Sequence, residues 1–422
     1  MDTAKQKPKK ESENIPTLLK IVRKFEKDEE LKDLIAFNET YQNIQFLKDW
    51  NKCKKNSYLE DEHESFLLYS LTEKLRQKIS KSELGDAMTE IAHRKIIRPI
   101  RDWLDSLIWD GTPRLGSWLH AYAGAEINDY TAQAGKITLT AAVARIYEPG
   151  VKFDYLLILE GPQRKGKSTL VKAIGGDWYL DMSLKENDKD IIDELRGCWV
   201  VEMSELAGFN RKEVDWLKSF LSRQVDRCRL SYGRRSKDFK RQVVFIGTMN
   251  PSGDNTYFRD DTGNMRFWPV TCGMIKVPEF KAVRNQLFAE AKNFYFTLKK
   301  QKDDGIIDGD YPFFLQGKAS EISEKEQSKR ELIDPWEMEV SRILTGKEET
   351  NTFDILRGLG LSIAQIGHGE KVRIGKILSK FGWHRHQRSD GHYIYIKEEV
   401  KSQGRYASKQ EEVVWSEEII KT

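Results

Sequence analysis

The clearest chemical signal in this sequence of 422 residues is the segment from Gly161 to Thr169, which has the spacing G-x-x-x-x-G-K-[ST]. The backbone N–H groups of such a loop, with the amino end of the following helix, bind phosphate oxygens. In this pattern Lys167 neutralises the β- and γ-phosphates, and Ser168 ligates Mg²⁺. A chance match is the alternative, but the apolar strand before the segment and the helical stretch after it favour a true P-loop. The expected nucleotide contacts are Gly161, Pro162, Gln163, Arg164, Lys165, Gly166, Lys167, Ser168 and Thr169.

A phosphate-binding loop also needs a carboxylate at the end of another buried strand. The run Trp199-Val200-Val201 delivers Glu202, which we predict to serve the metal or the attacking water, with Ser168 and Glu202 as the metal side of the site. Glu205 follows three positions later, and it either orients the water or caps the next helix. The sequence does not decide which of Glu202 and Glu205 is the catalytic base.

Two further residues complete the expected catalytic set. Asn250 follows the apolar run that begins at Val243, and ligands of an open parallel sheet bind beyond the carboxyl ends of its strands, so we expect Asn250 near the γ-phosphate. An ordinary Asn-Pro turn is the alternative for this residue. Arg266 follows a tight loop and precedes Phe-Trp-Pro, and we predict an arginine finger that acts on the nucleotide of a neighbouring subunit.

The elements that must position these residues suggest several domains, because single cores stop growing at about 250–300 residues. Apolar residues such as Phe37, Ile44 and Phe46 recur at spacings that we interpret as helical, and short apolar runs alternate with helices from residue 153 to about 270. We therefore predict an α/β protein whose parallel sheet has helices on both faces. The expected division is a tail over 1–14, a helical domain over 15–115, an ATPase domain over 116–325, a winged helix-turn-helix over 335–405 and a tail over 406–422.

Composition excludes some classes of protein. The 70 basic and 66 acidic residues give a net charge of only +4, so bulk charge does not indicate nucleic-acid binding. No apolar run reaches the ~18 residues of a membrane helix, and the polar segment from Met1 to Asn14 does not resemble a secretory signal. The 4 cysteines form no C-x-x-C pair and predict neither disulfides nor zinc. We expect a cytoplasmic protein.

The motifs, in this order, resemble the virulence-associated protein E family, a branch of the superfamily 3 helicases within the AAA+ ATPases. The resemblance runs from about Leu104 to Val270, and the overall plan is similar to replication initiators of staphylococcal pathogenicity islands. It implies an ATP- and Mg²⁺-dependent ring, expected to be a hexamer, that serves replication of a phage or related mobile element in a bacterial host. Besides the P-loop, it rests on the segments Trp109–Arg114, Asp226–Arg234 and Gly263–Pro269.

Two basic clusters are candidate DNA contacts. The first is the tip of an expected hairpin just before the Asn250 strand, where superfamily 3 helicases carry the element that grips DNA in the central channel. The second lies on the third helix and the wing of the expected C-terminal domain, where a recognition helix contacts duplex DNA. Solvated surface and protein contact are the alternatives for the two clusters. The residues are Arg234, Arg235 and Lys237 in the first cluster, and Lys371, Arg373, Lys376, Arg385 and Arg388 in the second.

The function that this sequence predicts is an ATP-dependent DNA helicase that initiates replication of a mobile element. The first alternative is an origin-binding ATPase that assembles or remodels replication complexes without processive unwinding. A P-loop kinase of small molecules is a weaker alternative, because it leaves both basic clusters unexplained.

Overall fold

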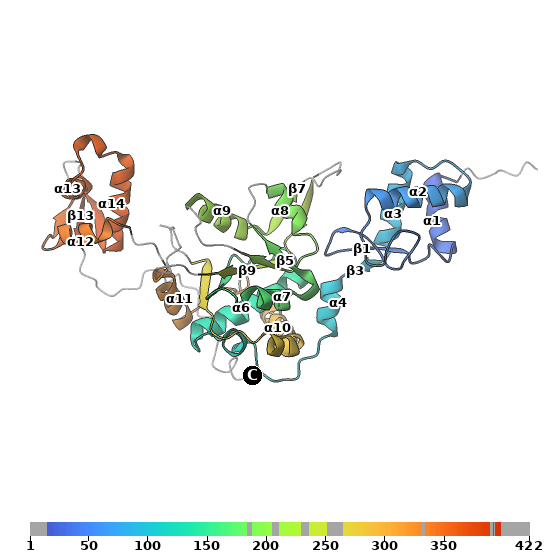
Figure 1. Ribbon diagram of the computed structural model, residues 1–422, viewed down its shortest axis with the longest axis horizontal. Coiled ribbons are helices and arrows are strands. Elements are labelled where there is room, and N and C mark those ends of the chain that lie inside the picture. Colours follow the sequence, from blue (N-terminus) through green and yellow to red (C-terminus); the bar gives the residue numbers. More distant parts are fainter. Residues whose placement is uncertain are drawn as a thin grey trace, which may run out of the picture.

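The computed structural model of the protein describes residues 15–183, 188–204, 211–228, 236–250, 265–330, 334–388, 391 and 393–397. Figure 1 shows three units in a row, with the largest one, which contains the parallel sheet, in the middle. Across these described residues, no helix combines the length and the apolar character that crossing a membrane requires.

The N-terminal unit combines helices with a small sheet, which corrects the helical interpretation of the stretch around Phe37, Ile44 and Phe46. Phe37 lies on strand β1, and Ile44 and Phe46 lie on β2. The spacing of these residues also fits the two-residue period of strands, and the turn between the strands decides the outcome, because the Asn38 side chain accepts hydrogen bonds from the backbone N–H groups of Thr40 and Tyr41. The elements are α1 (Thr17–Lys27), β1 (Ile35–Asn38), β2 (Asn43–Phe46), α2 (Asp61–Leu75), α3 (Lys81–His93) and β3 (Ile96–Ile97), with sheet order β2-β1-β3.

The central unit is built on a five-stranded sheet of order β10-β4-β9-β6-β5, in which every neighbouring pair is parallel. Because all strands run in one direction, their carboxyl ends form one edge of the sheet and their amino ends form the other. The prediction of an α/β unit with a parallel sheet is confirmed. The strands are β4 (Leu156–Glu160), β5 (Tyr179–Met182), β6 (Val200–Met203), β9 (Val244–Met249) and β10 (Phe267–Thr271).

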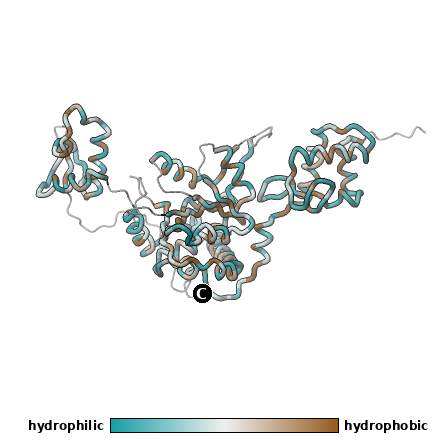
Figure 2. Tube along the Cα trace, in the orientation of Figure 1, coloured by the Kyte–Doolittle hydropathy of each residue, from teal (hydrophilic) through white to brown (hydrophobic). Residues whose placement is uncertain are grey.

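Helices cover both faces of this sheet, because its strands are apolar on both sides. On β4, Leu157 and Leu159 join the hydrophobic cluster of one face, and Leu156 and Ile158 join that of the other. Figure 2 shows brown, hydrophobic segments passing through this central sheet. One face carries α6 (Asp129–Tyr147), α7 (Lys167–Gly175) and α10 (Val277–Asp303), and the other carries α8 (Asp188–Glu194) and α9 (Arg211–Leu221); α4 (Pro99–Ser106), α5 (Trp118–Ala123), the 3₁₀ turn η1 (Gly176–Trp178) and α11 (Lys318–Ser328) complete the unit.

One strand of the sheet is formed by a segment that the sequence analysis interpreted only as an aromatic anchor. Phe267, Trp268 and Pro269 form most of β10, which is an edge strand paired with β4 alone. Proline has no N–H to donate to a neighbouring strand, so Pro269 would leave a gap in the hydrogen bonding of a central strand but is tolerated at the edge of the sheet.

Two antiparallel strands, β7 (Val225–Cys228) and β8 (Lys237–Lys240), form a hairpin that leads directly into β9. The hairpin therefore lies at the amino edge of the parallel sheet. Its strands agree with the hairpin predicted from the sequence.

The C-terminal unit contains three helices and a small sheet of order β11-β13-β12, in the order that the sequence suggested. Its core is a cluster that includes Val340, Ile355, Ile374 and Trp383. The elements are α12 (Glu337–Leu344), β11 (Glu349–Thr350), α13 (Thr352–Gly358), the 3₁₀ turn η2 (Ile363–Gln365), α14 (His368–Lys380), β12 (Trp383–Gln387) and β13 (Tyr393–Lys397).

Candidate active site

The P-loop joins the carboxyl end of β4 to the amino end of α7, as the motif requires. Gly166 immediately precedes α7 and has a φ of 90°, a conformation that favours glycine. Ser168 and Thr169 are exposed in the first turn of the helix, beside the exposed loop residues Pro162–Lys165. The loop therefore presents its helix N-terminus and a hydroxyl group to solvent.

Lys167 is the buried centre of this loop, with only 6% of its surface exposed. Its ammonium group donates to the carbonyl oxygens of Gly161 and Pro162 at 2.7 and 2.8 Å, and to Oδ1 of Asn250 at 2.8 Å. Burial lowers the pKa of Lys167 against the opposing effect of the Cys272 and Glu202 groups. The structure thus joins the P-loop lysine to the strand-end amide of β9.

Glu202 lies on β6, on the other side of β9 from the P-loop strand, and it is fully buried. One carboxylate oxygen accepts from the hydroxyl of Tyr179 and the other from Thr248 Oγ1, both at 2.5 Å. Burial, followed by this hydrogen bond, raises the pKa of Tyr179, which keeps its hydroxyl protonated as a donor. Each carboxylate oxygen of Glu202 has a second lone pair beside the one that accepts from its hydroxyl partner.

The sequence did not identify Tyr179 or Thr248 as members of the site. Thr248 could have been recognised, because it is a hydroxyl residue within an apolar strand and stands two positions before Asn250. No pattern in the sequence indicated Tyr179. Glu205, the second candidate acid, lies outside the described residues.

Arg266 lies at the opposite edge of the sheet from the P-loop of its own chain. Its carbonyl accepts a hydrogen bond from the N–H of Leu156, at the start of β4, whereas Gly161 follows the end of that strand. At ~3.3 Å per residue the two positions are roughly 16 Å apart along β4. Its guanidinium donates to the carbonyl of Lys218 on α9 at 2.9 Å. Arg266 therefore does not join the site formed by Lys167 and Asn250 within one chain.

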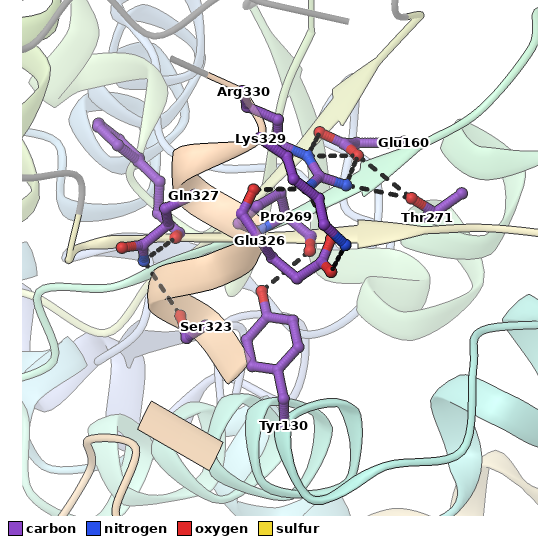
Figure 3. A network of polar contacts seen from close by, with 10 residues as sticks. Tyr130, Glu160, Pro269, Thr271, Ser323, Glu326, Gln327, Lys329 and Arg330 are labelled. Carbon is purple, nitrogen blue, oxygen red and sulfur yellow. Dashed lines mark hydrogen bonds and ion pairs between the residues drawn. The ribbon is translucent and has the colours of Figure 1, made fainter. Parts of the chain in front are cut away.

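A second polar network supports the base of the P-loop and was not predicted from the sequence (Figure 3). Glu160, the residue before Gly161, accepts from Nε and Nη2 of Arg330 at 2.6–2.8 Å, and Arg330 Nη2 also donates to Thr271 at 3.1 Å. Burial raises the pKa of Glu160 against the opposing pull of Arg330. The network ties the segment after α11 to the ends of β4 and β10. The sequence shows Glu160 as a carboxylate at the end of an apolar run, but it does not indicate that Arg330, 170 positions away, is its partner.

The same network covers the edge strand. Gln327 Nε2 donates to the carbonyl of Phe267 at 2.8 Å, and the Tyr130 hydroxyl donates to that of Pro269 at 2.9 Å (Figure 3). These side chains donate hydrogen bonds to carbonyl groups on the open side of β10, where no neighbouring strand supplies a donor.

The predicted DNA contacts differ in their surroundings. Lys237 is exposed on β8, whereas Arg234 and Arg235 lie outside the described residues. On α14, Lys371 is exposed and Lys376 is half-buried, and Arg373 forms a bidentate ion pair with Asp334 at 2.6 and 2.7 Å. The last two predicted contacts, Arg385 and Arg388, have partners within the C-terminal unit. Arg385 lies 3.6 Å from the ring centre of Tyr393, and Arg388 pairs with Glu349 at 2.7 Å.

Among the residues that the structure describes, no group of three or more His, Cys, Asp and Glu side chains is arranged to hold a metal ion. A metal at the P-loop would therefore depend on phosphate oxygens and water in addition to Ser168.

Comparison with known proteins identifies the family. Residues 104–331 match the virulence-associated protein E-like domain, and because this match covers more than half of the chain, the protein belongs to that family. No curated protein matches the chain.

Among solved structures, the apo structure of the NrS-1 C-terminal region is similar, with 13% identity, coverage of 86% of this chain and 95% of that chain, and a TM-score of 0.41. An A form apo structure of the same region has 12% identity, coverage of 86% and 96%, and a TM-score of 0.41.

Proposed function

We propose that the protein is an ATP-dependent DNA helicase of the superfamily 3 and AAA+ type, which initiates replication of a phage or phage-related mobile element. The proposal rests on family membership and on the residues at the carboxyl edge of the parallel sheet. In this proposal ATP is hydrolysed between the subunits of a ring, expected to be a hexamer, and the energy moves DNA.

The single observation that carries the proposal is the contact of Lys167 with Asn250 beside the P-loop. Lys167 uses its three N–H donors on two loop carbonyls and one amide oxygen. When ATP binds, phosphate oxygens take the place of these acceptors, and the freed Asn250 amide then faces the γ-phosphate. Lys167 thus changes partners from the protein to the substrate without leaving the site.

The P-loop also fits Mg²⁺, because the exposed Ser168 hydroxyl stands in the first turn of α7 next to the phosphate-binding N–H groups. When bound with ATP, the ion would neutralise charge on the β- and γ-phosphates. Glu202 contributes a buried negative charge whose position is fixed by Tyr179 and Thr248. In this proposal Glu202 would orient the attacking water or help to hold the metal ion.

A neighbouring subunit supplies the remaining cation in this proposal. Arg266 is far from its own P-loop along β4, so its catalytic role requires the nucleotide of the next chain. It must first leave the carbonyl of Lys218.

DNA contacts come from two places. The exposed side chains of Lys237 and Lys240 on β8 give the hairpin a basic surface for phosphates of a single strand. The C-terminal unit, proposed to be a winged helix, uses Lys371 and its neighbours on duplex DNA. Arg373 has a lesser part because Asp334 already neutralises it.

The test is ATP hydrolysis with and without DNA, followed by strand displacement on forks that carry a 3′ or a 5′ tail. A helicase hydrolyses ATP faster with DNA and separates one type of fork. DNA-stimulated hydrolysis without separation of either fork would instead support the origin-binding ATPase. Hydrolysis that DNA does not change would contradict both proposals and favour a small-molecule kinase.

A further inference from the structure

The base of the β7–β8 hairpin is held by a buried ion pair that the proposed mechanism has not used. Asp226 on β7 accepts from Nε and Nη2 of Arg241 at 2.6 and 2.9 Å. Only 5% of the Asp226 side chain and 1% of the Arg241 side chain are exposed. Such a bidentate pair fixes both the distance and the angle between the hairpin and the segment leading to β9.

Arg241 also reaches the end of α9. Its Nη1 donates to the carbonyl of Phe220, and its guanidinium lies 4.3 Å from the centre of the Phe220 ring. The last four carbonyls of a helix lack partners within the helix, and arginine is a favourable donor to them. The hairpin and the last turn of α9 are therefore joined through one side chain.

The same turn of α9 holds Arg266. The carbonyl of Lys218, two positions before Phe220, accepts from Arg266 Nη1 at 2.9 Å. One end of a short helix thus binds both the arginine at the hairpin base and the arginine expected to reach the neighbouring subunit. Arg241 and Arg266 are thus bound to two carbonyls of the same helical turn, those of Phe220 and Lys218.

We propose that the last turn of α9 relays DNA binding at the hairpin to Arg266, with Asp226 and Arg241 as positioning residues. This inference rests on the proposed function, because it assumes that the hairpin binds DNA and that Arg266 serves a neighbour's ATP. Contact of DNA with the hairpin shifts Arg241, the end of α9 follows, and the Arg266 guanidinium leaves Lys218. Hydrolysis in the next subunit then depends on DNA in this one.

The decisive variant replaces both partners of the ion pair, Asp226→Leu together with Arg241→Met. Removing one partner would leave a buried charge without compensation, whereas apolar replacement of both partners is commonly tolerated. The matched control is Arg227→Ala with Asp238→Ala, which removes an ion pair of the same hairpin that is exposed and 3.4 Å long. Arg241→Lys is a third variant, which keeps the charge and loses the two-pronged geometry.

The first readout is the ratio of ATPase rates with and without a single-stranded oligonucleotide. We expect the Asp226–Arg241 double variant to keep its basal rate and its oligonucleotide affinity while DNA no longer stimulates hydrolysis. The control pair keeps the stimulation, and Arg241→Lys gives an intermediate ratio. A merely structural role would instead lower basal rate, affinity and stimulation together, and that result would overturn the relay.

The second readout needs no hydrolysis. Trp216 on α9 stacks on Phe220 with ring centres 4.9 Å apart, so its fluorescence reports on the last turn of the helix. The signal is the emission of the protein minus that of the matching Trp216→Phe variant. We expect the oligonucleotide to change this signal in the unmodified protein and the control pair, but not in the Asp226–Arg241 double variant.

The outcomes separate the inference from the proposed function. If the unmodified protein binds the oligonucleotide but Trp216 does not respond, or if the double variant keeps both stimulation and response, the relay is wrong and the helicase proposal stands. If the unmodified protein binds no oligonucleotide, the proposed function fails and the relay fails with it.

Discussion

The two edges of the central sheet organise function in different ways. At the carboxyl edge, Lys167 and Asn250 come from separate sequence motifs and meet directly, with Glu202 on the next strand. At the amino edge, Arg241 and Arg266 are held by backbone carbonyls of α9, which no motif displays. The contacts at the first edge join residues of recognisable motifs, whereas those at the second edge join residues that only the packing of α9 brings together.

This difference explains why one chain is incomplete as a catalyst in the proposed function. The P-loop and Arg266 lie at opposite ends of adjacent parallel strands, so no modest side-chain movement unites them. A ring in which the amino edge of one subunit faces the carboxyl edge of the next removes the problem.

The largest effect is expected at the carboxyl edge, from Lys167→Ala. The change removes the cation that holds the β- and γ-phosphates, so ATP turnover should fall to background in a folded protein. The matched control is Lys172→Ala, an exposed lysine on the same helix, which should retain turnover. A steady-state ATPase assay decides, and normal turnover by Lys167→Ala would remove the basis of the nucleotide site.

The amino edge should show a similar loss for a different reason. Arg266→Ala should keep nucleotide binding but lose on the order of 10³-fold in ATPase rate, the lower end of the contribution of arginine fingers in other systems. Mixing this variant with Lys167→Ala should restore part of the activity, because some interfaces then combine an intact P-loop with an intact Arg266. If subunits exchange and the mixture stays inactive, Arg266 does not act between subunits.

A smaller loss, roughly 10²-fold in turnover with ATP binding retained, is expected from Glu202→Gln. The substitution keeps the shape of the side chain and removes the buried negative charge. Asp181→Asn is the control, since Asp181 is the exposed acid opposite Glu202 on the neighbouring strand β5. Equal rates for Glu202→Gln and the unmodified protein would direct attention to Glu205 as the catalytic acid.

The smallest effect is expected in the C-terminal unit, remote from both edges. Lys371→Ala should weaken duplex binding uniformly across sequences and reduce the slope of log affinity against log salt concentration by about 1. Arg388→Ala should change this slope less, because Glu349 already pairs with Arg388. Titrations at several salt concentrations measure both, and the reverse ranking would show that DNA displaces Glu349.

Much of the fold could be predicted from the sequence, because its signals were local. The apolar runs predicted β4, β6 and β9, whose side chains are buried on both faces. The N-terminal sheet was missed because Phe37, Ile44 and Phe46 fit the periods of both a helix and a strand over so short a stretch. The strand character of Phe267–Thr271 was missed because a proline within the run argues against a strand, except at the edge of a sheet.

The sequence by itself determined the groups whose function depends on neighbours along the chain. The P-loop is such a case, because its phosphate-binding N–H groups and Lys167 lie within one turn between a strand and a helix. The tertiary structure alone decided which distant groups meet, since that depends on strand order and packing. It brought Asn250 into contact with Lys167, which is 83 positions away in the sequence, and Arg330 into contact with Glu160, which is 170 positions away. It also placed Arg266 at the edge of the sheet opposite the P-loop. It also paired Arg373 with Asp334, a contact that the sequence did not predict.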